Sequence, residues 1–389
     1  MKNYRILTLT LGAVCGLSAA AGGGFTLSGT LPGVNDSVRV VLVNAERDKA
    51  VKIAETVTTD GTFTLADSVK MPKLCKLNIQ TRGKNGEFRS LTSPRLMVEN
   101  TDMKVSFLAP LDSMSNSHTP ETLIGVEGSK AQSQFEEYLD ACMAAERKAS
   151  DASYMSAKKY FESNNNRDTM MKYNELKKVA AAELLATQKR FIAGHPDYHI
   201  SSVLTYQELM RTFIYTDPEL VTMVETVKVC PDTARVGLND RALAWSRKYS
   251  LGMVFPDFEV CDTDKGVHPF SKYVTPGKYT FIDFWASWCG PCRSAIPHVR
   301  KLYNGYADKM NVYSISCDSD EAAWRKAMDK EQMEWTQLCL NDDQLSDVAQ
   351  LYLLSAIPRL LLLDPEGRIV CSTNLPDEVD EYLAKNVSL

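Results

Sequence analysis

Hydrophobic and polar positions follow three successive patterns along the chain, and the first is typical of β-strands. Short segments rich in β-branched and apolar residues lie at 25–31, 38–43, 74–81 and 103–108. Asp60-Gly61 stands among alternating residues, which favours a tight hairpin. Strands at these intervals predict a small all-β, sandwich-like domain over residues 22–120, with a packing or docking role.

From about Gly128 the apolar positions follow a helical period. Apolar residues recur at i, i+3, i+4 and i+7 over 135–142, and a second such pattern covers 173–191 after a turn at 164–166. Gly194-His195-Pro196 ends this segment, and helical spacing returns at 203–210 and 241–249. These patterns predict a helical region over residues 121–250.

The last third, residues 251–389, alternates strands and helices. The pattern predicts a buried strand over residues 277–286 and a helix over residues 293–306. Between them Cys289-Gly-Pro-Cys292 lies at a strand-to-helix junction. The free N–H groups and the positive dipole end of a helix stabilise a thiolate, so Cys289 is a candidate nucleophile, and Cys292 lies one turn further on, close enough to form a disulfide with it.

The same spacing also occurs in zinc sites. A structural zinc ion needs two further ligands at matching spacing, and the chain has a single Cys-x-x-Cys, so redox chemistry is favoured. His195 and His199 stand four residues apart, but Pro196 between them argues against the regular helix that a metal pair there needs. We therefore expect neither a stable metal nor a cofactor.

The first 21 residues have the layout of a secretory signal peptide. Lys2 and Arg5 precede an apolar run at 6–17, and three alanines at 19–21 offer a cleavage site. This predicts a mature protein in the periplasm or cell envelope, where disulfides persist. A buried N-terminal helix and a lipid anchor on Cys15 are the less favoured alternatives, the latter because residues 12–14 match the lipid-attachment pattern poorly.

Composition excludes several classes of protein. Hydrophobic residues make up 44% of the chain, which excludes wholesale disorder. Lys and Arg total 44 against 49 Asp and Glu, a net charge of −5 without a basic run, which excludes a nucleic-acid partner. After residue 21 no apolar run approaches the roughly 18 residues of a membrane span. Seven cysteines outside the pair and the leader show no disulfide framework, and we expect mostly reduced structural thiols: Cys75, Cys142, Cys230, Cys261, Cys317, Cys339 and Cys371.

Residues 283–292 resemble the active-site segment of thioredoxins, and especially of the extracytoplasmic TlpA/ResA-like thiol-disulfide oxidoreductases. The resemblance extends over about residues 252–389 and implies an α/β thioredoxin-like C-terminal domain. Its other motifs are an entry strand at 255–258, a helix-kinking Pro297, a core strand at 311–318, and a cis-proline loop with a closing hairpin at 356–367. More weakly, residues 25–250 resemble the regions that precede such modules in envelope proteins.

The resemblance implies a role for each residue of the site. Cys289 would attack the disulfide of a partner, and Cys292 would resolve the mixed disulfide. Asp283 matches the buried acid that helps to deprotonate the second cysteine, and burial would raise its pKa toward neutrality. The alternative for Asp283 is a partly exposed acid at the end of a strand.

The remaining candidates lie around the proline loop. Pro358, cis by resemblance, would bring the backbone of Ile357 beside the disulfide to pair with an extended substrate. Trp288 would offer a flat apolar surface, or simply pack. Arg359 departs from the threonine common in the family: its guanidinium would favour the Cys289 thiolate, select acidic partners or, the preferred interpretation, point to solvent. Cys317 departs from the aliphatic residue of relatives, and we expect a buried free thiol.

Gly290-Pro291, the dipeptide of thioredoxin, favours a protein-disulfide reductase. The expected partners are disulfide-containing envelope proteins and an upstream membrane thiol reductant. A disulfide oxidase or isomerase of the same fold, and an envelope binding protein with a scaffold module, are the alternatives.

Overall fold

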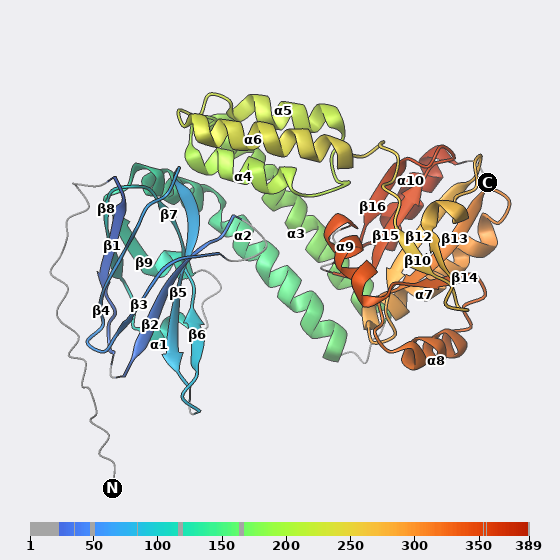
Figure 1. Ribbon diagram of the computed structural model, residues 1–389, viewed down its shortest axis with the longest axis horizontal. Helices are drawn as coiled ribbons and strands as arrows, with labels where there is room; N and C mark the ends of the chain where they lie inside the picture. The colour runs from blue at the N-terminus through green and yellow to red at the C-terminus, as the bar shows by residue number, and fades with distance from the viewer. Residues whose placement is uncertain are drawn as a thin grey trace, which may run out of the picture. The chain divides into compact units, whose positions relative to one another are not determined.

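The structure is a computed structural model that describes residues 23–34, 36–46, 51–83, 85–115, 120–162, 167–352, 354 and 356–387. The chain forms two compact units, Met1–Glu136 and Glu137–Leu389 (Figure 1). Within the described ranges, no helix has the length and apolar character needed to cross a membrane. The predicted signal peptide, the turn at 164–166 and Cys15 lie outside the described residues.

The N-terminal unit is a sandwich of two sheets. One sheet has the order β4-β1-β8-β9, and the other has β3-β2-β5-β6 with β7 also paired to β5. Alternate residues such as Phe25 and Leu27 of one sheet and Val40 and Leu42 of the other meet in a common core. The strands are β1 (Phe25–Thr30), β2 (Val38–Asn44), β3 (Val51–Thr58), β4 (Thr62–Asp67), β5 (Lys73–Arg82), β6 (Phe88–Thr92), β7 (Arg95–Val98), β8 (Asp102–Phe107) and β9 (Ile124–Glu127), with short helices α1 (Leu111–Met114) and η2 (Pro120–Leu123) before β9.

Two sequence expectations for this unit need correction. Asp60-Gly61 does form a tight turn, in which the Asp60 carboxylate accepts hydrogen bonds from the Thr62 N–H and the Thr58 hydroxyl, but no hairpin results. Instead β3 pairs with β2 and β4 pairs with β1, so the turn carries the chain from one sheet to the other. The unit also extends beyond residue 120, because β9 completes the first sheet by pairing with β8.

Helices follow, as the helical period predicts. They are α2 (Lys130–Glu162), α3 (Arg167–Gly194), α4 (His199–Leu209), α5 (Asp217–Val227), α6 (Thr233–Ser246) and η3 (Arg247–Tyr249). A capping box formed by Thr216 and Glu219 begins α5, a helix that the apolar pattern did not predict. The buried Phe213, between α4 and α5, stacks on Tyr352 with ring centroids 5.4 Å apart, so the helical region is joined to the C-terminal core.

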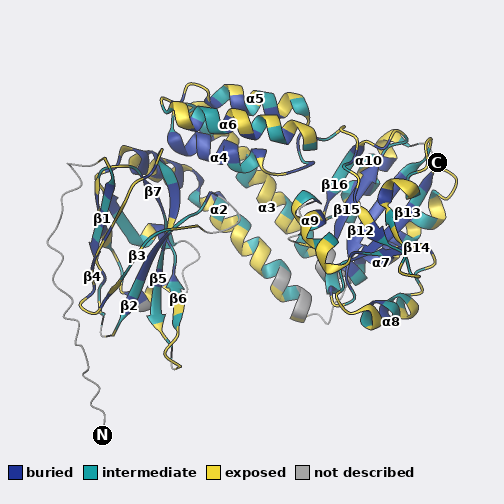
Figure 2. Cartoon of the chain, in the orientation of Figure 1, coloured by how far each residue is buried: buried dark blue, intermediate teal, exposed yellow. Residues whose placement is uncertain are grey.

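The C-terminal part is an α/β domain around a seven-stranded sheet of order β11-β10-β14-β13-β12-β15-β16. Its strands are β10 (Glu259–Cys261), β11 (Val267–Pro269), β12 (Tyr279–Trp285), β13 (Met310–Ser316), β14 (Thr336–Cys339), β15 (Arg359–Leu363) and β16 (Ile369–Thr373). The helices are η4 (Phe270–Tyr273), α7 (Gly290–Gly305), α8 (Glu321–Glu331), α9 (Asp342–Tyr352) and α10 (Pro376–Asn386). Figure 2 shows the central strands β12 and β15 as largely buried, which explains their continuous apolar sequences.

The two faces of this sheet carry separate cores. Phe281 and Trp285 of β12 lie in one core with Cys289, Cys292 and the apolar side of α7. Ile282 and Phe284 lie in the other, with residues of α9. The expected entry strand at 255–258 is irregular, and the strand β10 begins only at Glu259, because Asp257 accepts hydrogen bonds from Ser271 and holds this segment as a loop.

Candidate active site

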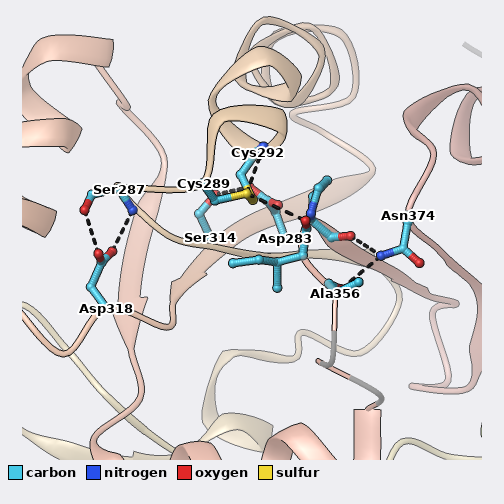
Figure 3. The surroundings of a disulfide bond; sticks show 10 residues. Asp283, Ser287, Cys289, Cys292, Ser314, Asp318, Ala356 and Asn374 are labelled. Carbon is cyan, nitrogen blue, oxygen red and sulfur yellow. Dashed lines mark hydrogen bonds between the residues drawn. A yellow bond between two sulfur atoms is a disulfide. The ribbon is translucent and has the colours of Figure 1, made fainter. Parts of the chain in front are cut away.

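Cys289 caps the N-terminus of α7, where β12 leads into the helix. Its Sγ accepts a hydrogen bond of 3.1 Å from the Cys292 N–H, and the two cysteines form a disulfide (Figure 3). Pro291 stands in the first turn, a position that leaves no backbone N–H unpaired. A sulfur at this position faces the free N–H groups and the positive dipole end of the helix. Both stabilise a negative charge, so the reduced Cys289 is favoured as the thiolate.

Only the edge of this disulfide faces outward. Cys289 and Cys292 are 5% and 1% exposed, whereas the neighbouring Trp288 is 72% exposed. An indole combines a large apolar ring with a polar N–H, and side chains of this kind are enriched where proteins contact other molecules. Trp288 thus presents a broad apolar surface next to the disulfide.

Asp283 is a fully buried acid beneath the cysteine pair. It lies two residues from both Phe281 and Trp285 along β12, so its side chain points to the same face of the sheet, which α7 covers. Burial raises the pKa of Asp283 from 3.8 to about 7, and a hydrogen bond from Ser314 opposes this rise. The alternative of a partly exposed strand-end acid is wrong, since Asp283 is 1% exposed.

The loop before β15 lies directly against the disulfide. The Ile357–Pro358 peptide bond is cis, as the resemblance implies, and the Ile357 carbonyl oxygen is 3.7 Å from Cys289 Sγ. Asn374, after β16, donates through Nδ2 to the carbonyl oxygens of Ala356 and Pro358 on either side of this bond (Figure 3). The loop is thus held in place by a side chain from the neighbouring strand.

The preferred sequence interpretation of Arg359 is wrong. Its side chain does not reach solvent but is 5% exposed at the start of β15, with Nη1 3.4 Å from Asn374 Oδ1. Burial and the positive charge of Arg211 lower the pKa of Arg359 to about 10, so the guanidinium remains charged at neutral pH. The reason is positional: Arg359 is the first residue of an interior strand, and both faces of that strand are covered.

A second network holds the segment before Cys289. Asp318 accepts hydrogen bonds from the Ser287 N–H at 2.8 Å and from the Ser287 hydroxyl at 2.6 Å (Figure 3). The Ser316 hydroxyl also donates to Asp318. Ser287, Ser314, Asp318 and Asn374 were not identified from the sequence as site residues. Ser314 lies in β13 and Asp318 lies two residues beyond it, both within the core strand expected at 311–318, whereas nothing in the sequence links Asn374 to the loop.

The other cysteines of the described chain are free thiols. Cys317 is half-buried rather than buried, and burial raises its pKa to about 12. His195 follows α3 and stacks on Phe191, whereas His199 begins α4, so the two belong to different elements. Within the described ranges, no three His, Cys, Asp or Glu side chains gather as metal ligands do.

Comparison with known proteins agrees with this geometry. A family described as Thioredoxin-like matches residues 277–369. The thiol-disulfide oxidoreductase ResA of Oceanobacillus iheyensis is 26% identical over 124 residues, which are 31% of this chain and 63% of that protein. ResA of Bacillus thuringiensis subsp. konkukian is 22% identical over 142 residues, 36% of this chain and 79% of that protein. The C-terminal third is therefore a thioredoxin-like domain, and it is related to the ResA thiol-disulfide oxidoreductases.

Solved structures match the same part of the chain. The thioredoxin domain of a thiol-disulfide oxidoreductase from Bacteroides vulgatus is 31% identical, with a TM-score of 0.33, and the match covers 36% of this chain and 98% of that one. A DsbE-type thiol:disulfide interchange protein described from Chlorobium tepidum is 24% identical, with a TM-score of 0.31, over 35% of this chain and 96% of that one.

Proposed function

We propose that the C-terminal domain reduces disulfide bonds of other proteins by dithiol exchange. The observation that carries this proposal is the Cys289–Cys292 pair at the N-terminus of α7, with the Ile357 carbonyl 3.7 Å from Cys289 Sγ. A reactive sulfur and the backbone of the proline loop stand side by side, which is the arrangement needed to attack a disulfide in an extended peptide.

The reaction uses the residues in a fixed order. In the reduced protein the Cys289 thiolate attacks one sulfur of the client disulfide, and the other client sulfur leaves as a thiolate that takes up a proton. Asp283 then accepts the proton of the Cys292 thiol through water or directly, and the Cys292 thiolate attacks Cys289 Sγ. The client leaves with both cysteines reduced, and the domain retains the disulfide, two electrons having passed to the client.

The direction of transfer rests on Gly290-Pro291. Thioredoxin, a reductant with a potential of about −270 mV, has this dipeptide, while strong oxidants such as DsbA lie near about −120 mV. A pKa of about 7 for Asp283 also suits a base that works near neutral pH. The dipeptide supports a reductase over an oxidase or isomerase, and the Asp283 base would serve the exchange in either direction.

We infer an extracytoplasmic location from the first 21 residues. Their basic start, apolar run and alanines have the layout of a secretory signal peptide. Clients would then be envelope proteins with disulfides, and a membrane thiol reductant would be needed to restore Cys289 and Cys292 to thiols. Mass spectrometry of the protein from the envelope fraction tests this: the mature chain should begin near Gly22, and an intact N-terminus in the cytosol contradicts it.

The reduction potential of the Cys289–Cys292 couple is the decisive measurement. The full chain is equilibrated in buffers of reduced and oxidised dithiothreitol, and free thiols are then alkylated. The alkylated fraction of the peptide that contains Cys289 and Cys292 gives the reduced fraction of the pair. We expect a potential of about −270 mV together with reduction of insulin disulfides, and a potential of about −120 mV would establish an oxidase. The variant with both cysteines changed to serine is the control, and insulin reduction by it would point to the scaffold alternative.

A further inference from the structure

Two further cysteines of the C-terminal domain face each other across a pair of strands. Cys261 ends β10 and Cys339 ends β14, and they are direct partners in the antiparallel register of these two strands. Their thiols form a hydrogen bond with each other. Cys261 Sγ also donates to Gln344 Oε1 at 3.5 Å, so the three side chains form a short chain of contacts.

From this juxtaposition we propose that Cys261 and Cys339 are a second, reversible dithiol–disulfide pair, which closes as a cross-strand bond. Directly opposed residues of antiparallel strands have Cα atoms about 4.5–5.5 Å apart. A disulfide needs Cα atoms about 4.4–6.8 Å apart, so the bond can close without a change in strand pairing. Both residues are half-buried, which leaves the thiols within reach of a small disulfide.

The pair is distinct from Cys289 and Cys292. Trp285, Ser316, Cys339 and Cys261 stand in register on four adjacent strands, which puts Cys261 about 14 Å from Trp285 at the usual strand spacing. Cys289 lies against Ile357, before β15, on the opposite side of β12 from β14. The second pair therefore exchanges with disulfides from outside the chain.

The oxidant we name is a low-molecular-weight disulfide of the glutathione type. The Cys261 thiolate attacks a sulfur of this molecule, and the first half leaves as a thiolate that takes up a proton. Cys339 then loses its proton to solvent and attacks Cys261 Sγ, and the second half leaves as a thiol. The two protein thiols are oxidised, and one small disulfide is reduced to two thiols.

Closing this bond would fasten the edge of the sheet. The β10–β11 hairpin is the outer edge, and within the described residues it pairs with β14 at one position, Cys261–Cys339. A covalent link at that position replaces a weak contact between thiols, so opening of the hairpin is slowed. The rate at which the β10–β11 hairpin opens would thus depend on the ratio of thiols to disulfides around the protein.

The test uses the full chain with Cys289 and Cys292 changed to serine, so that the result does not depend on the proposed reductase activity. The protein is equilibrated with reduced and oxidised glutathione in graded ratios, free thiols are alkylated, and peptides are identified by mass spectrometry. We expect the Cys261 and Cys339 thiols to disappear together, with a cross-linked peptide that dithiothreitol restores to two thiols. Hydrogen exchange over 259–269 should slow by about tenfold on oxidation.

Cys371 is the matched control. It is half-buried on β16 of the same domain, and its register partner is Leu362 rather than a cysteine, so it should give no internal cross-link. Cys261→Ser should abolish the cross-linked peptide. Cys339→Ala should abolish it too, and this second variant provides the test if Cys261→Ser folds poorly. The proposal is overturned if Cys261 and Cys339 remain separately alkylated at all ratios, or if each forms only its own adduct with glutathione.

Discussion

Ser314 Oγ donates a hydrogen bond of 3.1 Å to Asp283 Oδ2 from the directly paired position of the neighbouring strand. The same hydroxyl oxygen accepts a hydrogen bond of 2.8 Å from Trp335 Nε1, which fixes the direction of its proton. Asp283 Oδ1 has no hydrogen-bond partner among the described residues. The carboxyl is therefore stabilised on one oxygen and left available for a proton on the other.

Removing the hydroxyl should move the pH dependence of client release. In Ser314→Ala the hydrogen bond that opposes the raised pKa of Asp283 is lost, so the pKa rises further and less carboxylate is present near neutrality. We expect release from the mixed disulfide to be slower by roughly threefold to tenfold at pH 6, with little change at pH 9. Stopped-flow measurement of release across this range tests the expectation.

Thr280→Val is the control for this variant. Thr280 is also buried on β12, and its hydroxyl has no partner within the described chain, so the change should leave the pH profile in place. An identical displacement of the profile in both variants would contradict a specific role for Ser314.

Asp283→Asn should make the oxidised protein more stable at high pH. The folded protein holds the pKa of Asp283 at about 7, above its ordinary value of 3.8, so folding favours the protonated form. That stability is fully present below about pH 4 and is lost as the pH rises through 7; the loss is on the order of 4 kcal/mol. Asparagine stays neutral, so the variant should lack this loss, as urea unfolding at pH 4 and pH 8 would show. Equal stability differences at both pH values would contradict burial of an ionising acid.

The two active-site cysteines should differ in trapping clients. Cys292→Ser lacks the resolving thiol and should accumulate mixed disulfides through Cys289. Cys289→Ser retains only Cys292, which is 1% exposed and lies within the helix, and should trap at least roughly tenfold less. Non-reducing gels of the two variants with a disulfide-containing client measure this difference. Equal trapping would contradict the assigned order.

Asn374→Ala should weaken client binding more than chemistry. The amide of Asn374 holds the Ala356 and Pro358 carbonyls, and without it the loop that carries the Ile357 backbone is freer. We expect a KM several-fold higher, roughly threefold to tenfold, with kcat changed less, and a loss of about 1 kcal/mol of stability. Asn386→Ala, an exposed amide at the end of α10, is the matched control and should leave KM unchanged. A fall in kcat with KM unchanged would contradict a role of Asn374 in client binding.

The sequence by itself determined the features that depend on neighbours along the chain. The Cys289–Cys292 pair, the buried strand before it and the helix after it follow from local spacing, and the apolar run of β12 made a buried Asp283 with a raised pKa predictable. The alternation of strands in the N-terminal unit and the helical period after Gly128 are likewise local. Such periodicities are read directly because each element buries one face or, in β12, both.

Contacts between distant residues were decided only by the tertiary structure. The turn at Asp60-Gly61 has the local chemistry of a hairpin, yet competition from β1 and β2 for the same strand edges sends its two strands to different sheets. As a charged residue, Arg359 is expected at the surface, but it is buried because both faces of its strand are covered in the folded domain. Asn374 reaches the proline loop, and Cys261 meets Cys339, only because the sheet order brings them together. Sheet order depends on the balance of packing over the whole domain, which no short stretch of sequence contains.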